Sequence, residues 1–187
     1  MTVLQGEVVP VPETIRLVPF ERELLPRVLP WFDHPEVRRR LGGRSWPARE
    51  LTLRNAARGE EFRGRRVLRS HTFLALDGEG AAVAQVGGDV YDRWTLWDPA
   101  TEQVTWTAER RTMGAAYVVD PRRWGRGHGR ATLRAFVRAP ELADVEQFVL
   151  GIEPDNAASL GAARAAGFRP LTTEPDAEDM LYLHLLR

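Results

Sequence analysis

The chain has 187 residues, of which 43% are hydrophobic and 28% charged. Its 26 basic and 26 acidic residues cancel to a formal net charge of zero. This length and composition are typical of a single globular domain with a full core. Because there is no cysteine, disulfides, thiolate nucleophiles and cysteine-ligated metal sites are excluded. The sequence shows no secretory signal pattern and no apolar run of bilayer length, so we expect a cytoplasmic protein that binds no membrane.

The first quarter of the chain is expected to supply a tail, a strand and three helices. Residues 1–12 contain Pro10 and Pro12 and are expected to form a flexible tail ahead of a single domain over residues 13–187. Apolar residues within 21–32 follow a helical spacing that prolines bend. The other elements expected here are a strand over residues 14–19, a helix over 35–41, and a helix over 47–59 with Ser45 as its N-cap.

The rest of the chain alternates between strands and helices. Residues 70–76 and 81–91 are expected to form a hairpin around a glycine-rich turn. Residues 92–112 are polar but hold three tryptophans, which is typical of a long hairpin or flap. The elements expected after this segment are strands over residues 113–119, 147–152, 168–173 and 180–186, and helices over 131–138 and 156–166.

Residues 119–131 carry the most informative pattern in the sequence. Gly125, Gly127 and Gly129 occupy alternate positions between an apolar strand and a helix. Such a turn points backbone N–H groups at an anion, most often a phosphate, and glycine lets the ligand approach closely. A dinucleotide fingerprint would need glycine in place of Arg130, and a P-loop would need a lysine, which this chain lacks. The alternative that stays open is a glycine turn without a ligand.

The charges are unevenly distributed along the chain. Residues 121–139 hold six arginines and no acid, whereas residues 74–109 hold seven acids and a single arginine. These blocks are either two solvated surfaces, or a basic end for cofactor phosphates and an acidic end for a cationic acceptor. Aromatic residues are not interleaved with the arginines, so we expect no nucleic-acid partner.

A second motif follows the glycine loop. The strand over residues 147–152 leads into Asn156, Ser159, an alanine-rich helix and Gly167-Phe168. The two motifs together resemble the GCN5-related N-acetyltransferase (GNAT) superfamily over about residues 113–170. The resemblance implies an α+β fold, in which a central mixed sheet of six to seven strands is flanked by helices and acyl-CoA lies where central strands splay apart.

A narrower resemblance concerns the N-terminal half. Residues 30–37, ahead of Gly42-Gly43, are similar to the aminoglycoside 6'-N-acetyltransferase branch. It implies acetyl transfer from acetyl-CoA to a small cationic amine, aminoglycoside- or polyamine-like, by a monomer or homodimer that needs no metal. The residues that the resemblance assigns to acetyl-CoA are Val118, Val119, Trp124, Gly125, Arg126, Gly127, His128, Gly129, Arg130, Ala131, Asn156 and Ser159.

The sequence departs from the family at two positions that concern chemistry. Trp124 stands where the family has Gln or Arg at the head of the loop, and Ala163 stands where it often has the tyrosine that protonates the departing thiolate. Tyr117 is the candidate substitute for that tyrosine. Asp89 and Asp92 are the candidate general bases, with Glu109 as a further carboxylate near the acceptor end.

Other functions stay open on the sequence. Ala163 would also fit a catalytically idle module that binds CoA and acetylates no acceptor. A protein or peptide amine is an alternative acceptor. An interaction protein with a purely structural glycine loop is the third alternative, and it would show no stabilisation by CoA.

Overall fold

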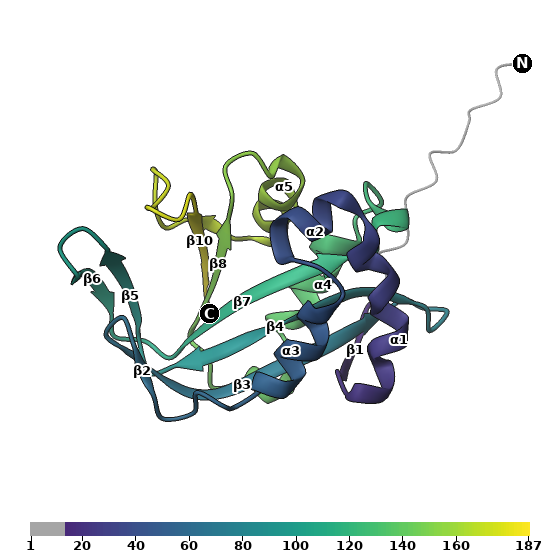
Figure 1. Cartoon of the computed structure of the whole chain (residues 1–187), viewed down its shortest axis with the longest axis horizontal. Coiled ribbons are helices and arrows are strands. Elements are labelled where there is room, and N and C mark those ends of the chain that lie inside the picture. The colour runs from purple at the N-terminus through teal and green to yellow at the C-terminus, as the bar shows by residue number, and fades with distance from the viewer. Residues whose placement is uncertain (1–13) are drawn as a thin grey trace, which may run out of the picture.

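The computed structural model describes residues 14–187, so the expected tail over residues 1–12 lies outside the described residues. Its main feature is an eight-stranded sheet with the order β1-β3-β4-β7-β8-β10-β9, in which β2 also pairs with β3 (Figure 1). The strands of this sheet are β1 Arg16–Pro19, β2 Glu61–Phe62, β3 Arg65–Leu76, β4 Ala82–Tyr91, β7 Thr112–Val119, β8 Gln147–Ile152, β9 Arg169–Pro170 and β10 Leu181–Leu186.

The sheet is mixed, as the sequence predicts. Only β7 and β8 run parallel to each other, and every other pair in the sheet is antiparallel. The number of strands is eight rather than six to seven, because the two-residue strand β2 adds to β3 at one end. A connection through a helix is what allows parallel neighbours, and α4 supplies it between β7 and β8.

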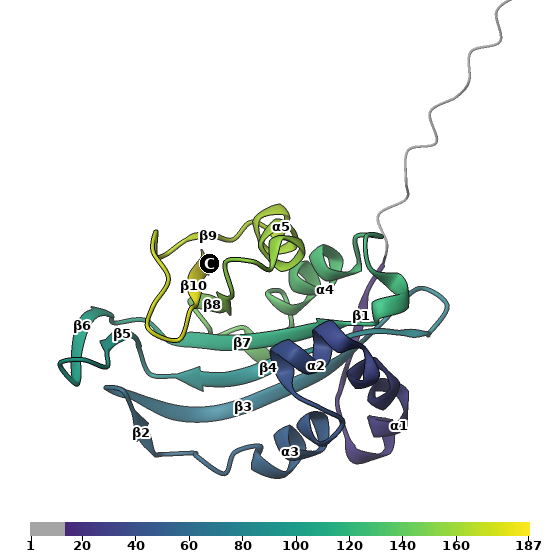
Figure 2. The same ribbon diagram turned by 45° about the horizontal axis from the view of Figure 1, so that its top comes forward.

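Helices cover both faces of the sheet. In Figure 2, α4 and α5 lie on one side of β7 and β4, and α1, α2 and α3 lie on the other. Leu133 and Phe136 of α4 join the larger core cluster, whereas Val28 of α1 and Val37 of α2 belong to a second cluster with Val118. The helices are α1 Leu25–Val28, α2 Pro35–Leu41, α3 Ser45–Leu53, α4 His128–Phe136 and α5 Ala157–Ala166.

Local residue chemistry explains where the helices begin and end. The predicted helix over residues 21–32 is divided into 3₁₀ turns on either side of α1, because Pro26 and Pro30 each remove a backbone donor. The prediction of Ser45 as an N-cap is wrong. Arg44 holds that position, and the Trp46 N–H already bonds the Gly43 carbonyl, so Ser45 lies inside the first turn.

Several other boundaries differ from the sequence prediction. Strand β3 begins at Arg65 instead of residue 70, and β9 covers only Arg169–Pro170 of the predicted strand over 168–173. Helix α3 ends at Leu53 instead of residue 59, and Asn55 beyond it adopts a left-handed conformation. Helix α4 begins at His128, three residues before the predicted start, because Gly127 with φ of 85° forms its left-handed N-cap. The predicted hairpin over residues 92–112 is present as a separate two-stranded sheet of β5 Trp94–Asp98 and β6 Gln103–Ala108, which we call the flap (Figure 1).

The two central antiparallel strands meet through small residues. Gly88 of β4 lies opposite Ala115 of β7, and a Cβ on Gly88 would be 2.0 Å from the Gly114 carbonyl oxygen. Because that obstacle is backbone, no side-chain rotation would relieve it. This approach holds β4 against the part of β7 that precedes the site described below.

Gly88→Ala should therefore lower the free energy of unfolding by about 1–3 kcal/mol, as overpacking does elsewhere. Gly161→Ala is the matched control, because nothing lies within 4 Å of a Cβ at that helical position. We expect the control to raise the free energy of unfolding by about 0.5–1 kcal/mol. Urea denaturation followed by circular dichroism measures both changes, and a neutral Gly88→Ala would contradict the packing argument.

Candidate functional site

The parallel strands β7 and β8 separate halfway along their length. Their pairing runs from Thr112 with Gln147 to Ala115 with Leu150 and then stops. Strand β7 continues to Val119 while it remains paired with β4, and β8 continues to Ile152 while it remains paired with β10. We call this opening, between residues 116–119 and residues 151–152, the fork. It includes Val118 and Val119, as the sequence predicts for the splayed strands.

The glycine loop lies at the open end of the fork. Gly125 and Gly127 both have positive φ, at 75° and 85°, which explains why glycine is needed at these two positions. Within the described residues, no side chain caps α4, and its first-turn bond runs from the Ala131 N–H to the Gly127 carbonyl. The amides of Gly129 and Arg130 therefore remain available to an anion at the positive end of the helix dipole.

Gly129 brings α4 close to both β7 and α5. A Cβ at this position would lie 3.4 Å from Ala162 and 3.5 Å from Tyr117 and from Val119. His128 is buried in the same turn and Ala131 is half-buried, so both residues position the helix. The close approach fixes the amides of α4 beside the fork.

Trp124 closes the base of the loop. Its indole N–H donates to the Val119 carbonyl at 2.9 Å, and its ring meets the His34 ring edge-on at 4.6 Å. Trp124 thus replaces the family's Gln or Arg with a contact that joins the loop to the end of β7 and to the start of α2. The indole remains 43% exposed, so one face is still open to a ligand.

The arginines around the loop divide into two kinds. Arg123 pairs with Asp77 of the β3–β4 turn at 2.8 Å, so its charge is already matched. Arg126 and Arg130 are exposed, and neither forms an ion pair with any residue between 14 and 187. Of the arginines on the loop, Arg126 and Arg130 therefore offer charge that no described acid matches.

Three predicted residues come together where α5 begins. The Asn156 side-chain oxygen accepts the Ser159 N–H at 3.2 Å and so caps the helix, and the Tyr117 hydroxyl donates to the Ser159 carbonyl at 3.4 Å. Burial raises the pKa of Tyr117, so this hydroxyl keeps its proton near neutral pH. Ala163 is fully buried in the core that Tyr117 borders.

A feature that the sequence analysis missed connects α2 to the end of β8. Arg40 forms ion pairs with Glu153 and with Asp155, and Arg39 bonds Asp155 at 3.1 Å. Together with the contact between His34 and Trp124, these pairs hold α2 on both sides of the fork. Partial desolvation opposes the charge of Asp155, but Arg39 and Arg40 lower its pKa overall. No local pattern indicates these pairs, because more than a hundred residues separate the partners.

The predicted bases occupy different environments. Asp89 lies opposite Gly114, at the closed end of the fork, and accepts the Ser70 hydroxyl at 2.6 Å. Burial raises the pKa of nearby Glu50, Arg49 offsets part of this effect, and the charge of Asp89 raises the pKa further. Asp92 instead accepts the Arg66 N–H at 2.8 Å and Arg93 at 3.3 Å, which fixes the edge of the sheet.

The acidic block over residues 74–109 does not form one negative cleft. Asp77 lies at the glycine-loop end, where it pairs with Arg123, whereas Asp89 and Asp92 lie toward the flap. Glu109 pairs with Arg93 at 3.1 Å and is exposed. The tryptophans also separate, because Trp94 is 5% exposed and contacts the Gly114 position, while Trp106 is 41% exposed.

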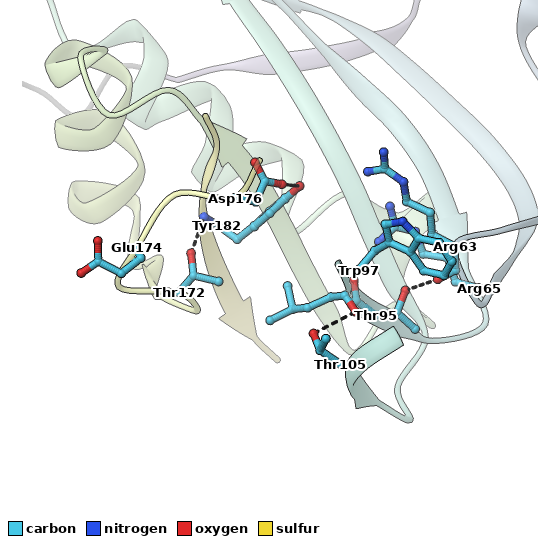
Figure 3. A pocket seen from close by; sticks show the side chains of 10 residues that line it. Arg63, Arg65, Thr95, Trp97, Thr105, Thr172, Glu174, Asp176 and Tyr182 are labelled. Atoms are coloured by element: carbon cyan, nitrogen blue, oxygen red, sulfur yellow. Dashed lines mark hydrogen bonds between the residues drawn. The ribbon is translucent and has the colours of Figure 1, made fainter. Parts of the chain in front are cut away.

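A pocket of about 180 Å³ opens between the flap and the segment that leads into β10 (Figure 3). Tyr182 of β10 is close to Gly151 at the fork, since a Cβ there would lie 3.3 Å from the tyrosine ring. The sequence analysis assigned no function to any residue of this pocket. The pocket is lined by Arg63, Arg65, Thr95, Leu96, Trp97, Thr105, Thr172, Glu174, Asp176 and Tyr182.

The side chains and helices of the described residues also bear on metal binding and on membrane crossing. Between residues 14 and 187, no three His, Asp or Glu side chains gather into a group that would hold a metal ion. No helix in that range combines the length and the apolar character that crossing a bilayer requires.

Comparison with protein families identifies the domain. The model of the acetyltransferase (GNAT) domain matches residues 14–169. An uncharacterized N-acetyltransferase, YfmK of Bacillus subtilis, is 36% identical over 87 residues, which are 46% of this chain and 58% of that protein. The chain thus aligns with little more than half the length of this curated relative.

Solved structures with the same fold cover most of the chain. An aminoglycoside acetyltransferase, AAC(6')-Ib in complex with coenzyme A, superposes with a TM-score of 0.64 at 15% identity, over 93% of this chain and 95% of that one. A chimeric spermidine N-acetyltransferase built on SpeG of Vibrio cholerae superposes with a TM-score of 0.60 at 12% identity, over 92% and 95% of the two chains. At this identity the likeness concerns the fold.

The ion pair between Asp77 and Arg123 should make the glycine loop sensitive to acid. Burial opposes the charge of Asp77, but the N–H groups of Ala81 and Glu79 and the Arg123 guanidinium lower its pKa overall. A carboxylate with a lowered folded-state pKa stabilises the fold above its ordinary pKa of about 4 and loses that contribution as the pH falls through the folded value.

Between about pH 6 and about pH 3, the Tm of the unaltered chain should therefore fall more than the Tm of Asp77→Asn. Differential scanning fluorimetry across this range measures the difference. Glu79→Gln is the control, because the Glu79 side chain on the same turn forms no ion pair within the described residues. Parallel curves for the unaltered chain and Asp77→Asn would contradict the assignment.

Proposed function

We propose that this chain, which belongs to the GNAT family of acetyltransferases, transfers an acetyl group from acetyl-CoA to a primary amine of a small molecule. The observation that carries the proposal is the meeting of the fork with the amides of Gly129 and Arg130 at the start of α4. The open end of the fork suits a pyrophosphate, and near its other end Gly151 lies beside Tyr182, which lines the pocket.

The residues of the fork fit the cosubstrate. The amides of Gly129 and Arg130 would take the pyrophosphate, and the side chains of Arg126 and Arg130 would add charge. The edge of β7 around Val118 and Val119 that β8 no longer pairs would hold the pantetheine arm, although the Val119 carbonyl already accepts the Trp124 indole N–H. Trp124, Gly125, Gly127 and Ala131 shape the loop, and Asn156 and Ser159 form the opposite wall at the start of α5.

The chemistry needs an amine, a base and an acid. The neutral amine attacks the thioester carbonyl, a C–N bond forms, the C–S bond breaks, and the amine proton passes to a base. Backbone N–H donors at the fork stabilise the oxyanion. Asp89 is the base that position favours, and Tyr117 is the candidate that protonates the thiolate. Asp92 stays an alternative base, although it would have to leave Arg66 and Arg93.

The finer identity of the acceptor belongs to this proposal too. The names of the structural neighbours, an aminoglycoside acetyltransferase and a spermidine acetyltransferase, support the cationic acceptor that the sequence predicts. A protein or peptide amine, and an idle module that binds CoA without turnover, are the competing possibilities. Release of CoA thiol with a panel of amines decides among them, since binding without turnover would favour the idle module.

Binding of CoA should depend on the glycine loop. Coenzyme A at about 100 times its dissociation constant should stabilise the folded chain by roughly 2.7 kcal/mol. Gly127→Val should abolish this stabilisation, because a branched residue at φ of 85° is strained and would disturb the amides.

Two further variants are compared in the same thermal-shift measurement. Arg126→Ala leaves the loop backbone intact and should weaken binding at low salt, with the loss shrinking as salt screens the charge. Gly161→Ala lies outside the loop and should bind CoA normally. A folded Gly127→Val with normal CoA binding would overturn the assignment of the loop.

The roles of Asp89 and Tyr117 are separable by kinetics. Asp89→Asn should lower kcat by about 100-fold, and higher pH should restore part of the rate because the amine then loses its proton in solution. Tyr117→Phe should lower kcat by about tenfold, since a thiolate leaves without a strong acid and the thiol pKa is only about 8.5. Asp92→Asn is the matched carboxylate control. Equal losses in Asp92→Asn and Asp89→Asn would remove Asp89 from the mechanism.

A further inference from the structure

Arg65 is a buried cation without a counter-charge. It lies at the start of β3 and is 9% exposed. Its guanidinium donates to the Thr95 carbonyl at 3.2 Å, while its Nε has no hydrogen-bond partner in the described part of the chain. Besides burial, the groups that most affect its pKa are Tyr91, which also hydrogen-bonds it, Tyr182 and Arg63, and none of these is a carboxylate.

Aromatic rings hold the guanidinium in place. It lies 3.8 Å from the centre of the Trp94 ring and 4.8 Å from that of Tyr91. Such contacts fix its orientation and offset part of the cost of burial, but they do not neutralise the charge. Burial lowers the pKa of Arg65, yet a guanidinium keeps its proton in proteins. The cation is therefore rigid, charged and open to an anion.

Two acids, Glu174 and Asp176, also line the pocket. Glu174 forms no ion pair within the described residues and lies on the side away from the two arginines (Figure 3), whereas Asp176 has partners. Asp176 accepts the Tyr182 hydroxyl at 2.8 Å and the backbone N–H of Met180 at 3.0 Å. Glu178 pairs with Arg63, so Arg63 is matched and Arg65 is not. Figure 3 shows both arginines on the flap side of the pocket, and Asp176 on the side of β10.

The guanidinium is also close to the place where acetyl transfer would occur. The Trp94 ring, over which the Arg65 guanidinium lies, is 2.8 Å from where a Cβ on Gly114 would stand. Gly114 is one residue before Ala115, the last residue of β7 that pairs with β8. The Tyr182 ring lies 6.1 Å from the Trp94 ring and covers Gly151 on the other side of the fork. A short molecule with its amine at the fork would thus reach Arg65.

We propose that Arg65 binds a carboxylate of the acceptor, so that the substrate is a small amine that also carries a carboxylate group, such as an amino acid. The inference rests on the proposed function, because it takes the fork as the place of transfer. The planar guanidinium suits a bidentate carboxylate, and the aromatic walls suit the carbon chain between the two charged ends.

Kinetics with matched amines test this proposal. L-leucine and L-phenylalanine are each compared with the carboxamide and with the decarboxylated amine, which keep the amine and lose the negative charge. Arg65→Gln should reduce kcat/KM for the amino acids at least tenfold, mainly through KM, and change kcat/KM for the analogues without a carboxylate less than twofold. Because each amine is compared between variant and unaltered enzyme, the difference in its own pKa cancels.

Two variants separate charge recognition from a structural role. Arg65→Lys keeps the charge beside Trp94 and should retain part of the preference for the carboxylate. Arg63→Gln removes the arginine that Glu178 already neutralises and should leave the preference unchanged. If Arg65→Gln lowers the rates with all amines alike, Arg65 only supports the flap and the proposal fails.

A binding measurement makes the result independent of turnover. N-acetyl-L-leucine and N-acetyl-L-leucinamide are titrated calorimetrically into the protein with CoA present. The carboxylate form should bind at least tenfold more tightly, and Arg65→Gln should remove this difference. No preference for the carboxylate would overturn the inference about Arg65 even if acetyl transfer to cationic amines supports the proposed function. A carboxylate preference without acetylation of any amine would instead support Arg65 and contradict the proposed transfer.

Discussion

The interruption of pairing between β7 and β8 is the constraint on which the rest of the site depends. Parallel strands that separate after Ala115 and Leu150 leave backbone groups without their usual partners inside a folded domain. The outer neighbours β4 and β10 keep pairing beyond this point, so each strand stays straight while the gap opens. A ligand that offers alternating donors and acceptors is the natural completion of such an edge.

Everything around the fork serves to keep it open at one end and closed at the other. Gly129 admits α4 close to β7, so the helix N-terminus points at the mouth of the opening. Asn156 caps α5 on the opposite side. The ion pairs of α2 with Glu153 and Asp155 bridge the same region from outside. Isolated surface pairs contribute little to stability, but a network of several charges that joins α2 to the loop between β8 and α5 restricts their relative motion.

How much of this the sequence predicts depends on how local the signal is. The glycine loop, the helix α2 and the helix that follows Asn156 depend on residues within a few positions of one another, and the structure has these elements close to where they were expected. Arg65, Tyr182 and the α2 ion pairs depend on contacts between segments far apart in sequence, which spacing cannot reveal.

The acidic block shows the same limit most clearly. Charges that are neighbours in the sequence lie at opposite ends of the sheet, because a strand extends by about 3.3 Å per residue. Asp89 is seven residues beyond Ala82, where β4 begins, and so lies roughly 23 Å from the turn that holds Asp77. A block of acidic residues that spans a hairpin is therefore divided between the two ends of the strands. Only the pairing register tells at which end each acid lies.

In the proposed mechanism, Tyr117 on β7 takes the role of the family's usual tyrosine, whose position is occupied here by Ala163. Ala162, Ala163 and Gly129 are all small, and this permits α4 and α5 to pack closely while the large ring of Tyr117 enters from the sheet. The ring replaces volume that a tyrosine on α5 would have filled, and its hydroxyl stays on the α5 backbone at Ser159. A phenol on a strand is held more rigidly than one on a helix surface, because its strand is paired with β4 along the whole stretch. In the proposed mechanism, the sheet that sets the fork would also set the position of the proton donor.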